Sequence, residues 1–212
     1  MAEIYTMNLF EPTTELYNKM LELVGENKRE KLLSLKQHKK QLQSLIADVL
    51  LRVILCARFN IDVNDMKFDD MNGKPYLVGE SVCFNVSHSE NMVAVAFSDR
   101  NIGVDLEKTR SVNPKLIDRY FTICEKEYIN VDLPDWESRF FEVWTKKEAF
   151  LKRSGVGLRV KLNELETKTC EGIKTYNLDG FVLSVCCDDK NFNIYNNEIC
   201  STILDKYFSR KI

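Results

Sequence analysis

The longest regular pattern in the chain is an apolar stripe that predicts an α-helix over about residues 37–58. Its members recur at alternating spacings of three residues and one, which places them on one helix face: Leu42, Leu45, Ile46, Val49, Leu50, Val53 and Ile54. A second long helix is predicted over about 135–153, where the apolar positions are Phe140, Phe141, Trp144 and Leu151. Each helix is expected to bury one face against a core.

Short apolar runs predict strands after the first helix and around the second. In the first half they are 82–86 and 92–97, joined by the polar segment 87–91, which is typical of a hairpin tip. Residues 102–107 alternate between apolar and polar positions, and 180–187 is a further strand-like run. The pattern therefore favours a mixture of helices and strands in both halves.

The order of a long helix followed by strands occurs once in each half of the chain. This repetition predicts an α+β protein made of two similar α/β lobes, over residues 1–101 and 102–212. No low-complexity segment separates the halves, so we expect them to pack closely together.

Composition and charge narrow the function classes. The 212 residues are 44% hydrophobic and 29% charged, as in ordinary globular proteins. The net charge of −2 argues against a general nucleic-acid-binding protein, and no apolar run is long enough to cross a membrane. The first residues lack the features of a signal peptide, and the seven scattered cysteines form no metal-binding spacing, so we expect a cytoplasmic protein with reduced thiols.

Two acidic residues in the middle of the chain form the first candidate site. Asp105 and Glu107 are two residues apart in a predicted strand, so both carboxylates share a face while Leu106 points to the other. Neighbouring carboxylates repel unless they share a cation, and oxygen ligands of this kind suit Mg²⁺. The alternative is a solvated acidic strand end with Lys108 as its partner.

The second predicted helix carries another candidate carboxylate. Glu148 is four residues from both Trp144 and Lys152, so the three side chains share a face. Trp144 is expected to anchor the helix in the core and to hold Glu148 at the edge of that core. The alternative is a surface salt bridge between Glu148 and Lys152, which contributes a few tenths of a kcal/mol.

Basic residues suggest a phosphate ligand. His88 lies between Ser87 and Ser89, and an imidazole with neighbouring hydroxyls can hold a phosphate. Lys28 and Lys31 belong to a basic cluster, although such residues are commonly solvated, as is a single histidine in a turn. Lys74 differs, because Pro75 restrains its backbone to an extended form and Gly73 leaves the approach to it open.

Taken in order, four segments resemble the motifs of the 4′-phosphopantetheinyl transferases. They are Gly73-Lys74-Pro75, Phe84-Asn85-Val86-Ser87-His88-Ser89, Gly103-Val104-Asp105-Leu106-Glu107 and Trp144-Thr145-Lys146-Lys147-Glu148-Ala149. The resemblance is to the two-lobed, surfactin-type branch of the family, and it covers nearly the whole chain. It begins at residues 28–31, continues through 121–125 and ends after 152–158.

The resemblance implies two lobes related by a pseudo-twofold axis, with coenzyme A in the cleft between them. It implies that Asp105, Glu107 and Glu148 bind Mg²⁺. It further implies that Lys147 and Lys152 neutralise phosphate charge. The expected reaction moves the phosphopantetheine arm of coenzyme A to a serine of an apo acyl or peptidyl carrier protein and releases 3′,5′-ADP.

The remaining site residues implied by the resemblance hold the nucleotide end or the reacting serine. Those expected at the 3′-phosphate and the nucleotide are Lys28, Lys31, Lys74, Pro75, Ser87 and His88. Glu148 is the first candidate for the general base and Glu125 is the second. The carrier protein is expected to dock near Tyr120, Phe121 and Ile123, or these are core residues instead, and the enzyme is expected to be a monomer.

One position departs from the family pattern. Gln43 stands where the family often has an arginine near the start of the first long helix, which affects how the nucleotide end is held.

Two rival functions follow from the same residues. The segment from Asp105 to Lys108 resembles the carboxylate–lysine core of restriction-type nucleases, although the chain lacks a basic face. A non-catalytic module of the same fold, which binds coenzyme A or a protein, is the other.

Overall fold

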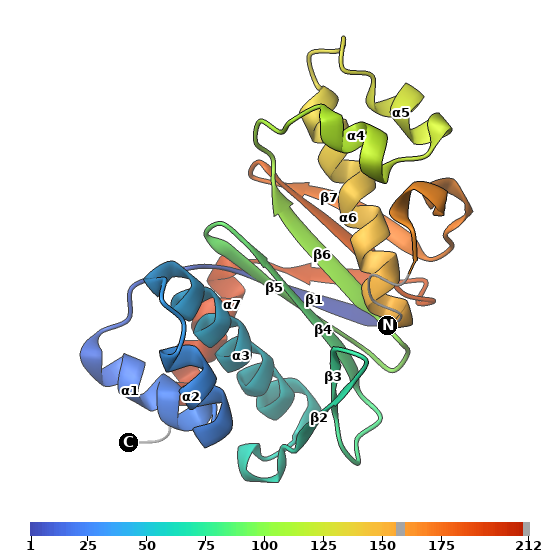
Figure 1. Cartoon of the computed structure of the whole chain (residues 1–212). Helices are drawn as coiled ribbons and strands as arrows, with labels where there is room; N and C mark the ends of the chain where they lie inside the picture. Colours follow the sequence, from blue (N-terminus) through green and yellow to red (C-terminus); the bar gives the residue numbers. More distant parts are fainter. Residues whose placement is uncertain (156–159, 210–212) are drawn as a thin grey trace.

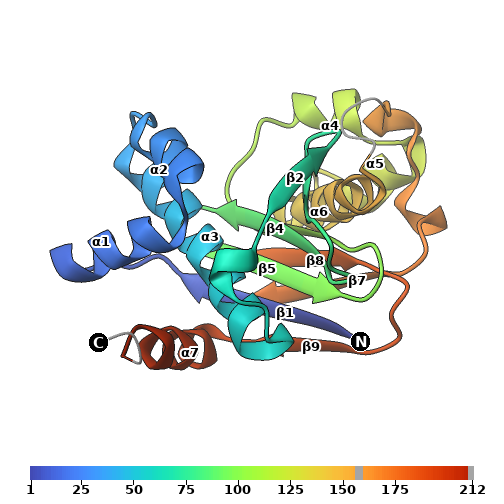
Figure 2. The same cartoon turned by 90° about the horizontal axis from the view of Figure 1, so that it is seen from below.

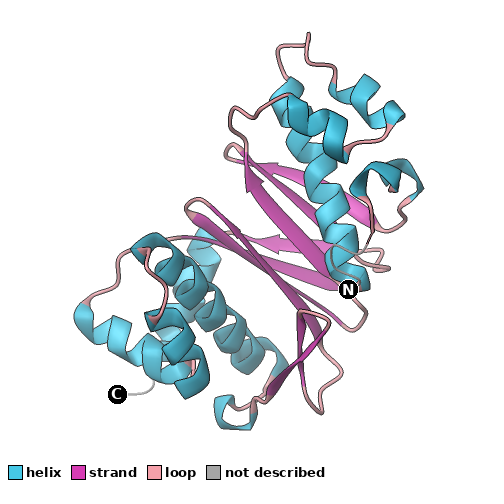
Figure 3. Ribbon diagram, viewed as in Figure 1, coloured by secondary structure: helices cyan, strands magenta, loops and turns pink. Residues whose placement is uncertain are grey.

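The computed structural model describes residues 1–155 and 160–209. Helices lie on the two outer sides of the molecule and strands lie between them (Figures 1 and 3). The mixed α+β class predicted from the sequence is confirmed. The last residues of the segment 152–158, from Val156 onwards, lie outside the described part of the chain.

The first half of the chain runs from a strand through three helices to a set of strands. Its elements are β1 (Ala2–Asn8), α1 (Thr14–Leu23), α2 (Glu26–Leu33), α3 (His38–Phe59), a 3-10 turn (Val63–Asp65), β2 (Phe68–Met71), β3 (Lys74–Leu77), β4 (Cys83–Ser89) and β5 (Met92–Ser98). The helix predicted over 37–58 is confirmed as α3. Its apolar stripe is buried, because it packs against β4 and β5.

The second half repeats this order of a strand, a long helix and two strands. Its elements are β6 (Gly103–Lys108), α4 (Lys115–Tyr120), α5 (Ile123–Ile129), α6 (Trp136–Ser154), two 3-10 turns (Leu162–Glu164 and Thr167–Thr169), β7 (Ile173–Leu178), β8 (Phe181–Cys186), β9 (Phe192–Tyr195) and α7 (Asn197–Ser209). The second predicted helix is confirmed as α6, and the strands predicted at 102–107 and 180–187 are confirmed as β6 and β8.

The sheets show the duplication. One sheet has the order β4-β5-β1-β9 and the other the order β6-β8-β7. In each, the strand before the long helix pairs antiparallel with the last strand of the following hairpin: Glu3 is opposite Phe97, and Gly103 is opposite Cys186. A third, two-stranded sheet is formed by β2 and β3 alone.

The end of the chain returns to the first sheet. β9 pairs with β1 in parallel, with Ala2 opposite Phe192, and α7 packs on β1 and α3. Figure 2 shows β9 and α7 beside β1. The lobe boundary between residues 101 and 102 stays a prediction, and residues 192–209 add their strand and helix to the sheet of the first half.

The two sheets share a core between them. Ile4 of β1 and Ala96 of β5 pack in one buried cluster with Val104 of β6 and Leu183 of β8. The halves therefore pack closely, as the absence of a linker in the sequence predicted. Among the described helices, none combines the length and the apolar character that a membrane crossing requires.

One strand boundary differs from the prediction. Residues 87–89 belong to β4, and the turn consists of Glu90 and Asn91 alone. Glu90 takes the left-handed φ of 50° in this turn. Because the strand continues through Ser87, His88 and Ser89, their side chains alternate between its two faces instead of gathering at a tip.

Candidate active site

The two sides of β4 face different environments. Phe84, Val86 and His88 point to a groove on the α3 side, whereas Asn85, Ser87 and Ser89 point to β6. The strand therefore separates the groove from the strand that carries Asp105 and Glu107. This alternation organises the whole site.

Side chains of β4, instead of the backbone of another strand, accept hydrogen bonds from the backbone of β6. The backbone N–H groups of Val104, Leu106 and Lys108 donate to Asn85 Oδ1, Ser87 Oγ and Ser89 Oγ at 2.9, 3.1 and 3.1 Å. These N–H groups lie on the edge of the second sheet, so the side chains give partners to donors that would otherwise be buried without one. The result is a side-chain ladder that joins the two halves.

The serines of this ladder also hold the two carboxylates. Ser87 Oγ donates to Asp105 Oδ1 at 3.2 Å, and Ser89 Oγ donates to Glu107 Oε2 at 2.7 Å. Each hydroxyl thus accepts from β6 backbone and donates to the carboxylate of the preceding residue. A slip of the register by two residues would remove one of these pairs, so the ladder sets the position of both carboxylates.

Helix α6 brings the third carboxylate to the same place. It packs against β6 so closely at Gly103 that a Cβ there would lie 2.0 Å from the carbonyl oxygen of Ala149. Lys152, one turn after Glu148, donates from Nζ to Asp105 Oδ1 at 2.7 Å and to Ser87 Oγ at 3.1 Å. Only glycine allows this approach, which brings α6 over the acidic face of β6.

The carboxylates influence one another electrostatically. Burial raises the pKa of Asp105, while the Lys152 ammonium opposes that increase. Burial also raises the pKa of Glu148, and the negative charges of Asp105 and Glu107 add to it. The charges of Asp105 and Glu107 thus act on Glu148, and its place with them as a metal ligand stays a prediction.

The donor set suits a hard divalent cation. Asp105 Oδ2 is buried and has no hydrogen-bond partner within the described part of the chain, and the neighbouring oxygens come from carboxylates and hydroxyls. As they stand, however, no three His, Cys, Asp or Glu side chains among the described residues are arranged to hold a metal ion. The Lys152 ammonium forms an ion pair with Asp105, and the Arg110 guanidinium forms one with Glu107, 3.0 Å from Oε2. Oxygen ligands of this type fit Mg²⁺.

A groove of about 1230 Å³ lies on the other side of β4. The structure brings Lys28, Lys31, Pro75 and His88 together in its lining, from α2, β3 and β4. Partial burial lowers the pKa of His88, and the positive charges of Lys152 and Lys28 lower it further. The groove therefore combines lysines with a histidine that favours its neutral form, a suitable lining for a phosphorylated nucleotide.

Two residues expected at the nucleotide face away from this groove. Ser87 lies on the β6 side of β4, and Lys74 donates from Nζ to the carbonyl oxygens of Ile102 and Arg153 at 2.9 and 3.0 Å. The reason is strand geometry: successive side chains alternate, so Lys74 and Pro75 point to opposite sides, as Ser87 and His88 do. Burial lowers the pKa of Lys74.

Lys147 and Glu125 also differ from their expected places. Lys147 Nζ lies 2.6 Å from Glu125 Oε2 and donates to the carbonyl oxygens of Leu162 and Leu165, both at 2.6 Å. Its side chain is 0% exposed and that of Glu125 is 3% exposed. This arrangement commits Lys147 to three protein partners instead of a phosphate, and it commits Glu125 to Lys147.

Gln43 has a local partner. Its side-chain amide donates to the carbonyl oxygen of Glu90 at 2.9 Å, in the turn between β4 and β5. Gln43, which is expected to stand where the family often has an arginine, therefore anchors the end of β4 that carries His88.

The residues expected near the carrier protein are divided between core and surface. Phe121 is buried and packs with Phe140 and Trp144, whereas Ile123 is 77% exposed on α5. Tyr128 and Val131 are also exposed. Phe121 is thus a core residue, and the apolar surface lies along α5 and the residues that follow it.

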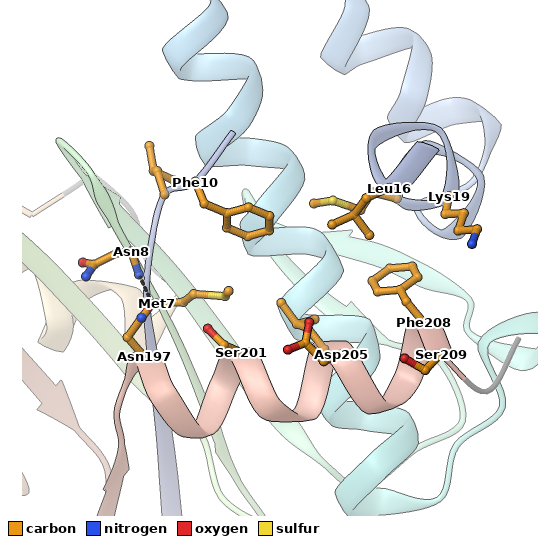
Figure 4. Close-up of a pocket in the computed structure, with 13 residues that line it drawn as sticks. Met7, Asn8, Phe10, Leu16, Lys19, Asn197, Ser201, Asp205, Phe208 and Ser209 are labelled. Carbon is orange, nitrogen blue, oxygen red and sulfur yellow. Dashed lines mark hydrogen bonds between the residues drawn. The ribbon is translucent and has the colours of Figure 1, made fainter. Parts of the chain in front are cut away.

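A second pocket lies at the far side of the first half. It has a volume of about 510 Å³ and lies between β1, α1 and α7, where the rings of Phe10 and Phe208 line it (Figure 4). Its one lysine, Lys19, forms an ion pair with Glu15 at 2.7 Å. The groove beside β4 is the candidate nucleotide site because Lys28, Lys31 and His88 line it together, beside carboxylates such as Asp48, whereas the smaller pocket has a single lysine in its described lining.

Sequence reasoning missed Asn85 and Ser89, which extend the ladder on both sides of Ser87. The available signal was their spacing of two residues, parallel to that of Val104, Leu106 and Lys108. The prediction of a hairpin tip over residues 87–91 conceals the alternation, because strand periodicity is not expected in a loop. Arg110, beside Glu107, had no signal in the sequence.

Comparisons with known proteins identify the family. A family model described as the 4′-phosphopantetheinyl transferase superfamily matches residues 101–199, and a model of a 4′-phosphopantetheinyl transferase N-terminal region matches residues 8–100. The nuclease and the non-catalytic module gain no support from these matches.

Lys108, the lysine of the nuclease-like segment, points away from the carboxylates. Its ammonium lies over the Phe181 ring, 4.5 Å from the ring centroid, and donates to the carbonyl oxygen of Asp179.

Curated relatives match over most of the chain. The 4′-phosphopantetheinyl transferase Sfp of Bacillus subtilis (strain 168) is 27% identical over 90% of this chain and 94% of its own. The 4′-phosphopantetheinyl transferase pptA of Paxillus involutus is 30% identical over 72% of this chain and 69% of its own. HetI of Nostoc sp. is 38% identical over 55% of this chain and 53% of its own. The chain therefore belongs to the 4′-phosphopantetheinyl transferase superfamily.

Proposed function

We propose that this transferase binds coenzyme A across β4, with the nucleotide in the groove and the pyrophosphate at the carboxylates. The observation that carries the proposal is the alternation along β4. His88 faces the groove lined by Lys28 and Lys31, while the next residues on either side, Ser87 and Ser89, hold Asp105 and Glu107. One strand thus links the proposed nucleotide site, which Lys28 and Lys31 line beside carboxylates such as Asp48, to an acidic reaction site.

Asp105, Glu107 and Glu148 would hold Mg²⁺ in this proposal. The ion would supply positive charge to the phosphate oxygens of coenzyme A, as metal ions do in phosphoryl transfer. Asp105 Oδ2, which has no hydrogen-bond partner among the described residues, would face the ion, while the Lys152 ammonium lies 2.7 Å from Oδ1. In this proposal Lys152 also contacts a phosphate oxygen.

The chemistry moves one phosphoryl-linked arm from one oxygen to another. A serine Oγ of the carrier protein attacks the phosphorus that bears pantetheine, the bond from that phosphorus to the ADP oxygen breaks, and 3′,5′-ADP leaves. Glu148 takes the serine proton in this proposal with the carboxylate oxygen that is not used for Mg²⁺, since a positioned carboxylate contributes about 10²- to 10⁴-fold. Glu125 is unsuited to that role, because its oxygens are committed to Lys147, Thr122 and Thr167.

The acyl or peptidyl carrier protein would dock along α5. Ile123, Tyr128 and Val131 expose apolar surface there, and α5 packs on α6, which carries Glu148. The chain contains both halves of the proposed site, so we infer that the enzyme acts as a monomer, and we propose separately that it is cytoplasmic.

Intact-mass spectrometry tests the proposed reaction. Purified enzyme, coenzyme A and Mg²⁺ are incubated with apo acyl and apo peptidyl carrier proteins. The expected result is a gain equal to the mass of the phosphopantetheine arm on at least one carrier, and no gain when its acceptor serine is replaced by alanine. Binding of coenzyme A without any gain on these carriers would contradict the proposal.

A further inference from the structure

Lys74 connects the wall of the groove to the acidic site. It begins β3, the strand of the β2–β3 hairpin whose next residue, Pro75, lines the groove. Its ammonium lies on the opposite side, 2.9 Å from the carbonyl oxygen of Ile102 and 3.0 Å from that of Arg153. One side chain therefore joins three elements that are far apart in the sequence.

The two carbonyls belong to the elements that carry the carboxylates. Ile102 immediately precedes β6, which bears Asp105 and Glu107, and Arg153 lies in the last turn of α6, which bears Glu148. β6 and α6 cross close to these two carbonyls. Their backbones are in tight contact there, since a Cβ on Gly103 would lie 2.3 Å from the backbone nitrogen of Arg153. The ammonium binds at the point where the spacing of strand and helix is set.

The end of α6 favours a cation. The last carbonyls of a helix lack partners within the helix and carry its negative dipole end. The ammonium of Lys74 donates to one of them, while the backbone N–H of Gly155 donates to Leu151 O and closes the helix. The lysine thus satisfies a carbonyl that the helix itself leaves open.

We propose that Lys74 is a positioning residue that ties the nucleotide-binding hairpin to the crossing of β6 and α6, so that the groove and the carboxylates keep one fixed geometry. This proposal rests on the assignment of groove and carboxylates under the proposed function. It differs from the role that the family resemblance implied, in which Lys74 contacts a phosphate.

Two substrates separate these roles. The Lys74→Met variant is compared with wild type using coenzyme A and 3′-dephospho-coenzyme A, which lacks the 3′-phosphate. A positioning role predicts a loss of about 10- to 100-fold in kcat with both substrates, because misplacement of reacting groups by about 1 Å is costly. It also predicts a lower melting temperature of the enzyme without substrate.

The matched control is Lys28→Met, which removes a lysine that lines the groove. It is expected to raise KM for coenzyme A with little change in kcat or melting temperature. If Lys74→Met fails to fold, Lys74→Gln is used: its shorter side chain keeps an amide donor but loses the ammonium, so a smaller loss in kcat is expected, again equal with both substrates.

Three results would overturn the proposal. They are a defect of Lys74→Met that disappears with 3′-dephospho-coenzyme A, an unchanged kcat, and an unchanged melting temperature. The melting temperature is measured without substrate or carrier, so failure of the proposed transfer reaction in wild type would be distinguished from failure of this inference.

Discussion

Lys147 and Glu125 form an ion pair inside the second half of the protein, with 2.6 Å between Nζ and Oε2. The lysine lies on α6 next to Glu148 in the sequence, yet its ammonium points to α5 and to the carbonyls of Leu162 and Leu165. Glu125 in turn accepts from the backbone N–H groups of Thr122 and Thr167. The pair therefore holds α6, α5 and the segment after α6 together.

Loss of one partner of this pair is expected to destabilise the fold. Lys147→Met leaves Glu125 as an unpaired buried charge, which costs about 3–5 kcal/mol. Urea denaturation measures the change in the free energy of unfolding. Lys146→Met is the matched control: Lys146 pairs with Glu142 at the surface, and its loss should cost at most about 1 kcal/mol. Equal effects of the two substitutions would contradict the structural role of Lys147.

Removal of the charge of Glu148 is expected to stop turnover and to leave the fold intact. Glu148→Gln removes the proposed base and relieves repulsion from Asp105 and Glu107. We expect turnover to fall by about 10²- to 10⁴-fold and the melting temperature to stay the same or rise. Carrier modification followed by mass spectrometry and a thermal melt measure the two quantities. A normal rate, or an unfolded variant, would contradict the assignment.

The ladder residue Ser89 is expected to matter for the reaction although it is outside the groove lining. Ser89→Ala removes the hydrogen bond to Glu107 and leaves the Lys108 N–H without its acceptor, a loss of about 1–3 kcal/mol. We expect a higher Mg²⁺ concentration for half-maximal activity and a lower kcat. Ser111→Ala, at an exposed serine, is the control and should match wild type. An unchanged Mg²⁺ requirement in Ser89→Ala would count against the ladder as a positioning device.

His88 is expected to make stability fall on mild acidification. Its folded-state pKa lies below the ordinary value of 6.5, chiefly because of partial desolvation, so the unfolded chain binds a proton first as the pH falls. Stability is therefore present above about pH 6.5 and is lost as the pH falls through the folded pKa. His88→Gln should show a smaller loss of unfolding free energy between pH 7 and about pH 5. Identical pH profiles for the two proteins would contradict this shift.

Local periodicity was sufficient for most of the fold. The apolar stripes predicted α3 and α6 within one or two residues, because each long helix buries one face against a sheet. Alternation predicted β6 and placed Asp105 and Glu107 on one face, as the structure shows through their bonds to Ser87 and Ser89. The ordered motifs identified the family, and the family models and relatives confirmed it.

Tertiary packing decided which way the site residues face. Lys74 and Ser87 belong to family-like motifs that form strands. One face of each strand packs against a segment far away in the sequence, and the sequence alone does not specify which face that is. Lys147 and Glu148 are consecutive on α6, and only the position of α5 determines that one becomes buried and the other joins the carboxylates. The sequence alone thus determined the elements, the acidic strand and the family. The tertiary structure decided that one face of β4 lines the groove and the other contacts β6, because a contact between residues far apart in the chain leaves no periodic signal in the sequence.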